Sequence, residues 1–236
     1  MSSPAASPGR GQGAGLILAI DTSTRTSLVA VGQAEPTATS VRHVGHRHGS
    51  HLLEQVDEAL AAAAATIDDV AAVAVGTGPG SFTGLRVGLA TAKSIAYALD
   101  LPLLGVPSSD ALRRAALAVA PGSAHVAIVL PAGAHDHYLV RAGRDPVLVA
   151  PGGLEDALDG DPALSVDMDP GTLGRAAAEL GEAALAGLAA ALLAMAAERL
   201  AAGELDEPAA LVPAYVALPR GVSRAAEELG WSPDLQ

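Results

Sequence analysis

Apolar runs and helical apolar spacing alternate along the first half of the chain. Residues 15–21, GLILAID, form an almost wholly apolar run, which is typical of a central strand buried on both faces. Ser50 is a candidate N-cap, and the leucines and valine that follow it lie on one face of a helix. The predicted strands are residues 15–21, 27–32, 37–44, 70–75 and 103–106, and the predicted helices are residues 50–65 and 85–99.

The second half repeats this order of elements more loosely. A linking helix precedes three strands, a short helical piece after Pro151, one further strand and a long helix. Three strands followed by helix, strand and helix, occurring twice, predict an α/β fold of two similar lobes with a cleft between them. The halves match in order only, because no residue-level repeat is visible. The predicted elements are helices at 109–119 and 181–200 and strands at 125–130, 137–142, 146–150 and 164–166.

The same pattern predicts how the chain divides. The expected division is a disordered tail over residues 1–14, an N-terminal lobe over 15–108, a smaller second lobe over 109–220 and a C-terminal tail over 221–236.

Composition narrows the classes of function. Half of the residues are hydrophobic, yet 53 of the 236 residues are alanine and only 2% are aromatic. Nucleic-acid binders that stack bases on aromatic platforms, and interfaces anchored on Trp and Tyr, are therefore disfavoured. The formal net charge of −12 repels a phosphate backbone, so we do not expect the chain to hold RNA or DNA unaided. The aromatic residues are Phe82, Tyr97, Tyr138, Tyr215 and Trp231.

The cysteine content and the apolar segments indicate in which cellular compartment the protein is expected. The absence of cysteine excludes disulfides, thiolate metal sites and cysteine nucleophiles, and it favours a reducing cytoplasm. Residues 1–14 have neither the basic nor the apolar region of a secretion signal. The longest apolar run, residues 183–197, is too short to span a bilayer and lies between Glu182 and Glu198. We therefore predict a cytoplasmic protein without a membrane partner, in which this run is a buried helix.

Residues 76–88, GTGPGSFTGLRVG, connect a predicted strand to a predicted helix. The glycines define a tight turn whose backbone N–H groups could hold an anion at the helix N-terminus, and Ser81 or Thr83 could cap that helix. No Walker lysine follows, and the dinucleotide spacing fails because Thr83 stands at the third glycine position. Spacing alone leaves two interpretations open, which are a ligand-binding loop and a plain strand-to-helix turn.

Very small residues recur every four positions through the same segment. Such a ridge allows another helix to approach closely. A glycine inside a soluble helix lowers helix stability by about 1 kcal/mol relative to alanine. Two glycines in one helix therefore suggest a compensating gain, and close packing against another segment would provide it. The pattern does not decide whether the packing partner is the chain's own first helix or a helix of another subunit. The ridge consists of Gly80, Gly84, Gly88, Ala92 and Ala96.

Asp21 ends a predicted buried strand and is followed by hydroxyl residues. One carboxylate with neighbouring hydroxyls can hold the metal and phosphates of a nucleotide, but Asp followed by Thr or Ser also closes ordinary turns. A nucleotide site of this kind needs a second carboxylate from the equivalent strand of the second lobe. Pro131 stands at that position, and Asp136 is expected in the hairpin turn. The candidate nucleotide-binding residues are Asp21, Thr22, Ser23, Gly78 and Gly80.

Four histidines lie near the start of the first predicted helix. Two of them, three residues apart, could share a helix face as half of a metal site, but no acidic or thiolate ligand stands nearby. We therefore favour a solvated, locally basic helix entry and predict no metal site. No GxSxG elbow or HExxH helix is present, so nothing recommends a hydrolase. The histidines are His43, His46, His48 and His51.

Three segments together resemble the TsaB (YeaZ) family, the dimerisation subunits of bacterial tRNA threonylcarbamoyladenosine (t6A) synthesis. The segments are LAIDTSTRTSLVAVG, HGSHLLEQVDEAL and VAVGTGPGSFTGLRVGLATAKSIAYALDLPLLGVPSSDAL, and the resemblance covers roughly residues 16–112. PAYVALPRGV resembles the closing Pro-x-Tyr segment of the family. The Asp-Ala-Arg that is usual in the family before a hairpin is replaced here by Pro131, Ala132 and Gly133.

The resemblance implies two ribonuclease H-like lobes of the actin-like ATPase (ASKHA) fold, with mixed sheets flanked by helices. It also implies a non-catalytic scaffold without an intrinsic cofactor or metal, which pairs with TsaD and TsaE and reaches tRNA only through that complex. ATP or ADP at the complex interface and a homodimer in the absence of TsaD are further expectations. The alternative is an ASKHA-type ATP-binding enzyme that uses Asp21 and the glycine-rich loop.

In the family, the first two helices of the N-terminal lobe form the pairing surface. The resemblance therefore favours a subunit-facing ridge, and we expect Gly84→Leu or Gly88→Leu to block pairing while leaving the fold largely intact. The expected interface residues are Ser50, Leu53, Val56, Leu60, Gly80, Ser81, Phe82, Thr83, Gly84, Arg86, Val87 and Gly88.

Overall fold

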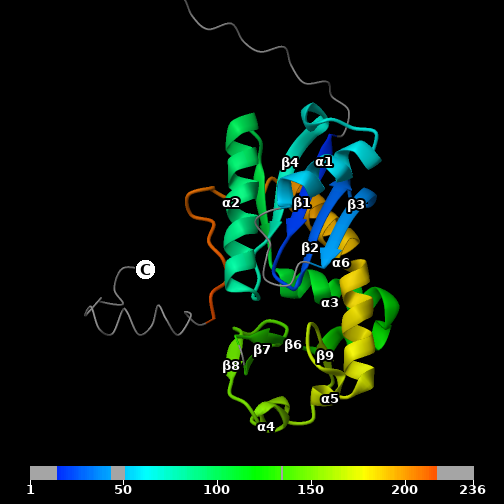
Figure 1. The fold of residues 1–236 in the computed structure, drawn as a ribbon, viewed down its shortest axis with the longest axis vertical. Coiled ribbons are helices and arrows are strands. Elements are labelled where there is room, and N and C mark those ends of the chain that lie inside the picture. Colours follow the sequence, from blue (N-terminus) through cyan, green and yellow to red (C-terminus); the bar gives the residue numbers. More distant parts are fainter. Residues whose placement is uncertain (1–14, 44–50, 134, 217–236) are drawn as a thin grey trace, which may run out of the picture.

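The first apolar run forms the central strand of a five-stranded sheet in the computed structural model, which describes residues 15–43, 51–133 and 135–216 (Figure 1). Strand β1 pairs with β2 in antiparallel and with β4 in parallel orientation, and the strand order is β3-β2-β1-β4-β5. The strands are β1 (Leu16–Asp21), β2 (Thr26–Gly32), β3 (Pro36–His43), β4 (Val70–Gly76) and β5 (Leu103–Val106).

The second sheet repeats this pairing with one strand fewer. Strand β6 pairs with β7 in antiparallel and with β9 in parallel orientation, and the order β8-β7-β6-β9 mirrors β3-β2-β1-β4. The predicted α/β fold of two similar lobes with mixed sheets is therefore confirmed. The strands are β6 (Ala127–Ala132), β7 (Asp136–Val140), β8 (Val147–Val149) and β9 (Ala163–Ser165).

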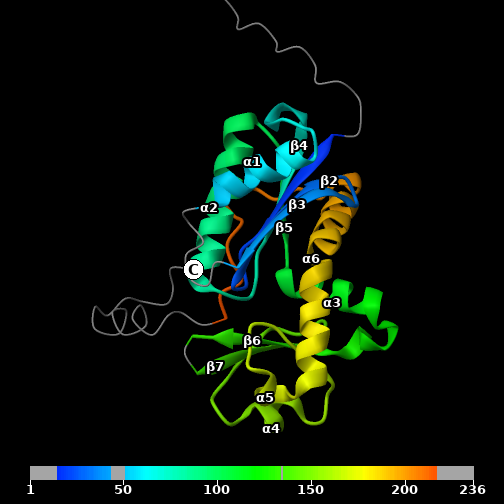
Figure 2. The same cartoon turned by 45° about the vertical axis from the view of Figure 1, so that its right-hand side comes forward.

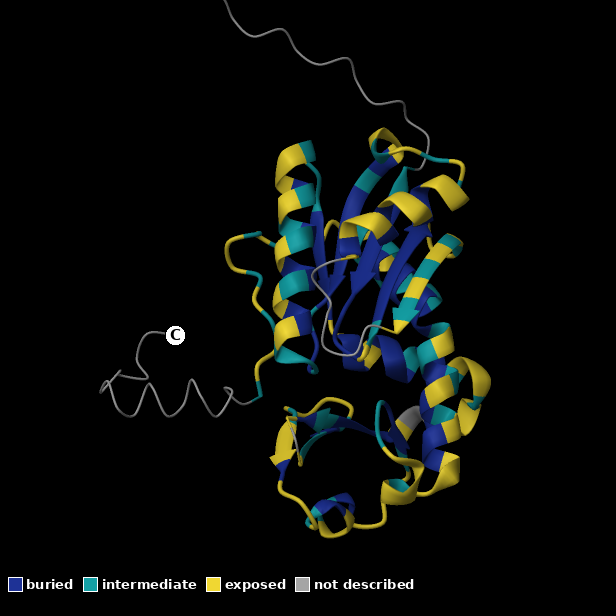
Figure 3. Ribbon diagram, viewed as in Figure 1, coloured by how far each residue is buried: buried dark blue, intermediate teal, exposed yellow. Residues whose placement is uncertain are grey.

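Helices cover both faces of the first sheet (Figure 2). Alternate residues of β1 point to opposite faces, as strand geometry requires. Leu18 and Ile20 join a core with α1 and α2, whereas Ile17 and Ala19 join a core with α3 and α6. Figure 3 shows the strands buried between these helices. The helices are α1 (Leu52–Ala62), α2 (Phe82–Leu99), α3 (Ser108–Val119), α4 (Leu154–Leu158), α5 (Pro170–Leu173) and α6 (Arg175–Ala201), with 3₁₀ turns η2 (Ile67–Asp69) and η3 (Pro121–His125).

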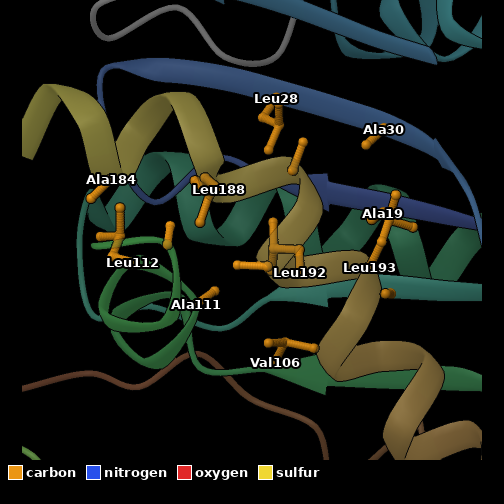
Figure 4. Close-up of a cluster of buried hydrophobic side chains, with 14 of the residues drawn as sticks. Ala19, Leu28, Ala30, Val106, Ala111, Leu112, Ala184, Leu188, Leu192 and Leu193 are labelled. Atoms are coloured by element: carbon orange, nitrogen blue, oxygen red, sulfur yellow. The ribbon is translucent and has the colours of Figure 1, made fainter. Parts of the chain in front are cut away.

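Helix α6 joins the two lobes through one continuous core. Its Leu188, Leu192 and Leu193 pack with α3 and with strands of the first sheet (Figure 4), and the same cluster includes Ile128 and Leu164 of the second sheet. Among the described residues, α6 is the one helix long and apolar enough to cross a membrane by length and composition. Here it packs inside the protein, as predicted for the run at 183–197.

The long helix begins six residues before its predicted start. Gly181 lies within α6, where a Cβ would stand 1.9 Å from the backbone oxygen of Ser165. The glycine that we expected to open the helix is therefore a contact point with the last residue of β9. The helix begins instead after Gly174, whose φ of +86° breaks the chain direction from α5.

The chain returns from α6 to the first lobe. Residues 203–216, which we call the strap, run along the edge strand β5, where the N–H of Asp206 donates to Leu103 O at 3.0 Å. The Asp206 carboxylate accepts a hydrogen bond from Gly105 N–H at 2.7 Å and pairs with Arg199 at 2.9 Å. Burial would raise the pKa of Asp206, but the bonds from Arg199 and Gly105 lower it. The strap covers a sheet edge that would otherwise be open.

Replacing Gly181 by alanine tests the close packing of α6. Alanine improves helix propensity by about 1 kcal/mol, but here its Cβ collides with the Ser165 backbone, which cannot rotate away. We expect Gly181→Ala to lower the free energy of unfolding by about 2 kcal/mol. Urea unfolding measures the effect. Gly122→Ala is the control, because a Cβ at Gly122 meets nothing within 4 Å; an equally stable Gly181→Ala would contradict the packing argument.

Candidate functional site

The Asp21 carboxylate at the end of β1 is fully buried and is held by the chain itself. Its Oδ1 accepts hydrogen bonds from the N–H of Ser23 at 2.9 Å and from the Ser23 hydroxyl at 2.7 Å. Its Oδ2 accepts a hydrogen bond from the Ser108 hydroxyl at 2.6 Å. A carboxylate that accepts several hydrogen bonds is stabilised in its charged form. Asp21 thus joins β1, the loop after β1 and the start of α3.

Ser108 extends this network to the glycine-rich loop. Its hydroxyl, which donates to Asp21, accepts a hydrogen bond from Gly78 N–H at 3.0 Å. Gly76 lies so close that a Cβ there would stand 1.8 Å from Asp21 Oδ2. The glycines therefore allow the loop to fold onto the carboxylate.

The ridge of small residues faces the interior of the chain. A Cβ at Gly88 would lie 2.2 Å from the Thr22 hydroxyl oxygen, and a Cβ at Gly80 would lie 2.0 Å from the Ser23 carbonyl oxygen. The Thr22 hydroxyl donates a hydrogen bond to Gly84 O at 2.8 Å. Gly84 and Gly88 are both buried. At Gly80 and Gly88 the ridge thus packs against the loop after β1, so these two glycines do not face another subunit, and the subunit-facing interpretation is corrected there; Ala92 and Ala96 lie in the core shared with α1.

This correction changes the expected effect of the glycine substitutions. A leucine side chain at Gly88 would overlap Thr22, and one at the buried Gly84 would have to displace its surroundings. Gly84→Leu and Gly88→Leu would therefore disturb the fold and cannot report on pairing alone.

Three backbone N–H groups at or just before the start of α2 donate hydrogen bonds to other groups of the chain. Ser81 N–H donates to Ser23 O at 2.7 Å, and Gly84 N–H donates to the Ser81 hydroxyl at 3.2 Å, which makes Ser81 the N-cap. Gly78 N–H is bonded to Ser108. These three donors, which a phosphate could use in a nucleotide-binding loop, already have partners here.

The second lobe offers no carboxylate at the end of β6. Pro131 pairs with His137 in the ladder, and Ala132 pairs with Asp136. Asp136 therefore begins strand β7, and its expected place in the hairpin turn is wrong. The two lobes contact each other near Asp21, where the backbone N–H of Arg25 donates to the carboxylate of Asp167.

Helix α1 is fixed to the sheet by a buried amide. The Gln55 side chain accepts a hydrogen bond from the Ser27 hydroxyl at 2.7 Å and donates to Ser27 O and Ser40 O, both at 3.2 Å. Arg42 on β3 pairs with Glu54 and Glu58 of α1 at the surface. These bonds orient α1 so that Leu53 faces outward and Val56 faces the core.

Helices α1 and α2 lie on the same face of the first sheet, and we call their outward residues the α1–α2 face (Figure 1). Leu53 is 63% exposed, although it is a large apolar residue. The expected interface residues fall into two groups. Val56, Leu60, Gly84 and Gly88 are buried, whereas Leu53, Gly80, Ser81, Phe82, Thr83, Arg86 and Val87 are exposed or half-buried. Ser50 lies outside the described residues.

The histidines do not form a metal centre within the described ranges. His51 Nδ1 lies 3.1 Å from Glu54 Oε2 on α1, so an acidic residue does stand beside one histidine, contrary to the sequence-based expectation, and His43 ends β3. The described residues contain no group of three or more His, Cys, Asp or Glu side chains that could hold a metal ion. His46 and His48 lie outside the described residues.

Three residues that organise the site were missed in the sequence. Ser108 donates a hydrogen bond to the Asp21 carboxylate, and Gln55 of α1 accepts one from β2. The ring of Tyr215 packs against the ring of Phe82 at the start of α2. A lone Ser or Gln carries no spacing signal, since its partners stand far away in the sequence. Tyr215 belongs to the Pro-x-Tyr segment, and that motif was the one available signal.

Comparisons with known proteins agree with this architecture. The family model described as TsaD, tRNA N6-adenosine threonylcarbamoyltransferase, matches residues 40–159, just over half of the chain. TsaB of Haemophilus influenzae, named a tRNA threonylcarbamoyladenosine biosynthesis protein, is 33% identical over 132 residues, which is 56% of this chain and 55% of that protein. TsaB of Escherichia coli is 36% identical over 90 residues, 38% of this chain and 39% of that protein. The chain thus spans about half the length of the curated relatives it matches.

Two solved structures from Pseudomonas aeruginosa share the fold. One, described as YeaZ, has a TM-score of 0.63 at 23% identity and covers 85% of this chain and 99% of its own. The other, described as similar to the peptidase YEAZ, has a TM-score of 0.65 at 23% identity and covers 86% of this chain and 100% of its own. The TsaB proteins are thus relatives of this chain and the YeaZ structures share its fold, while the match to the family model shows that the chain belongs to the TsaD-like family.

Proposed function

We propose that this chain is a non-catalytic scaffold in the synthesis of t6A on tRNA. In this role it pairs with TsaD through the α1–α2 face, joins TsaE in the cytoplasm, and lets its partner subunits make the contacts with tRNA. Its relatives are named for t6A biosynthesis, and its net charge of −12 disfavours a grip on RNA of its own.

The observation that carries the proposal is the occupied carboxylate of Asp21. Both of its oxygens accept hydrogen bonds from the chain's own Ser23 and Ser108, and the second lobe ends β6 with Pro131 and Ala132. An ASKHA enzyme needs carboxylates that face a nucleotide-bound metal, as the sequence-based alternative required. The α1–α2 face, in contrast, exposes the apolar side chain of Leu53 and leaves Phe82 and Val87 half-buried.

Reconstitution tests the proposed role directly. When the chain is mixed with TsaD, TsaE, TsaC, threonine, bicarbonate, ATP and a tRNA that reads ANN codons, we expect t6A to form. When the chain alone is omitted, we expect t6A to fall to background, because TsaD lacks its scaffold. Nucleoside mass spectrometry measures the product. Equal t6A with and without the chain would reject the proposal.

Leu53→Asp tests the α1–α2 face. Leu53 is 63% exposed, so a charge there leaves the core intact but cannot be buried against an apolar partner surface. We expect the affinity for TsaD to fall roughly tenfold or more, measured by isothermal titration. Val119→Asp is the matched control, because Val119 is 59% exposed on α3 and lies away from this face. Wild-type affinity for Leu53→Asp would place the interface elsewhere.

Asp21→Asn tests whether this carboxylate serves the fold or a nucleotide. Asparagine keeps one oxygen that can accept a hydrogen bond, but its amide nitrogen cannot accept the bond from the other serine. We therefore expect the free energy of unfolding to fall by about 2 kcal/mol. Asp57→Asn on the exposed side of α1 is the control and should change it by less than about 0.5 kcal/mol. Isothermal titration of the wild-type chain with ATP and Mg²⁺ completes the test. Micromolar binding that Asp21→Asn abolishes would favour the enzyme alternative.

A further inference from the structure

Two aromatic rings and one cation meet at the N-terminal end of α2. The ring centroids of Phe82 and Tyr215 are 5.0 Å apart at an interplanar angle of 35°. The Arg86 guanidinium carbon lies 5.3 Å from the centroid of the Phe82 ring. Both contacts are within the range at which aromatic pairs and cation–π pairs attract each other. In a chain with one Phe, three Tyr and one Trp, two of the five aromatic residues are used in this cluster.

Tyr215 reaches Phe82 because the strap is fixed along its length. The Asp206 carboxylate anchors the strap to Gly105 and Arg199. The Leu211 side chain packs against Gly105, where a Cβ would lie only 2.5 Å from Leu211 Cδ1. The N–H of Ala214 donates to Thr77 O at 2.8 Å, and this bond fixes the backbone immediately before Tyr215. The strap therefore brings one ring from residue 215 to the glycine-rich segment.

The Arg86 guanidinium lies over the face of an aromatic ring, whereas several other described arginines pair with carboxylates. Within the part of the chain that the structure describes, five arginines pair with carboxylates, and Arg86 is not among them; the five are Arg42, Arg114, Arg141, Arg175 and Arg199. Arg86 is exposed on the α1–α2 face. A ring face orients a guanidinium without neutralising it, so its donors and its charge stay available to a carboxylate.

We propose that Tyr215 is a positioning residue for partner recognition. Tyr215 holds the Phe82 ring, the Phe82 ring orients the Arg86 guanidinium, and Arg86 receives an acidic side chain of the partner at the α1–α2 face. The inference rests on the proposed function, because the partner that supplies the carboxylate is TsaD. It adds a role for the strap, which brings residues from the far end of the chain to the pairing surface.

A double-mutant cycle with Tyr215 and Arg86 tests this coupling. We expect Tyr215→Ala to weaken the affinity of the full chain for TsaD roughly fivefold, measured by isothermal titration at low salt. Tyr215→Phe keeps the ring and should restore affinity, whereas Tyr215→Leu keeps an apolar anchor for the strap without the ring and should not. In the Arg86→Ala background, Tyr215→Ala should have no further effect, because the group that it positions is gone. Val212→Ala, at an exposed strap residue, is the control.

The outcomes separate this inference from the proposed function. If the wild-type chain does not bind TsaD, the proposed function fails. If it binds and Tyr215→Ala weakens binding equally with and without Arg86, Tyr215 acts only on the fold and the inference is overturned. Tyr215→Leu binding like the wild type also overturns it, and this variant keeps the test valid if Tyr215→Ala does not fold. A loss of affinity that shrinks as salt increases supports the carboxylate contact.

Discussion

The fold depends on backbone segments that approach each other more closely than ordinary side chains allow. Helix α6 touches the end of β9 at Gly181 and α3 at Gly187, where a Cβ would lie 3.0 Å from Ala115 Cβ. The helix thereby packs against both sheets, and one core includes residues of each lobe. Small residues make such contacts at little loss of side-chain entropy. Alanines such as Ala115 of α3 and Ala184 of α6 take part in this shared core.

The same constraint acts around Asp21 and decides what that region can do. Gly76, Gly80 and Gly88 let the segment from β4 to α2 lie directly on Asp21, Ser23 and Thr22. A buried carboxylate in this position needs partners, and the nearest donors come from the chain itself. The glycines that resemble a phosphate-binding loop in the sequence thus serve contacts within the protein. Glycine spacing alone could not separate the two uses, because each requires a backbone without Cβ atoms.

Local patterns predicted nearly all of the strands and helices, while contacts between distant segments stayed hidden. The apolar run at β1 and the helical spacing in α1 and α2 are local, and both lobes follow from the repeated order of elements. The direction in which Gly88 faces depends on Thr22, which stands 66 residues earlier in the chain. The predicted helix start at Gly181 was wrong, because in a sequence a glycine that permits close packing inside a helix looks the same as one at a helix boundary. Residues 203–216 show no periodic spacing of apolar residues, so the sequence did not predict the course of the strap.

The arrangement also explains why a chain with few large side chains can still offer a recognisable surface. The inner faces of α1 and α2 are buried against the sheet, so the outward side chains, Leu53, Phe82 and Arg86, stand on helices that are fixed in place. Gln55 fixes one helix and Ser81 caps the other, which leaves these side chains little freedom to lose on binding. Affinity at such a face comes from pre-organisation more than from buried aromatic area. The strap adds to this by placing Tyr215 beside Phe82, whose ring face orients the Arg86 guanidinium.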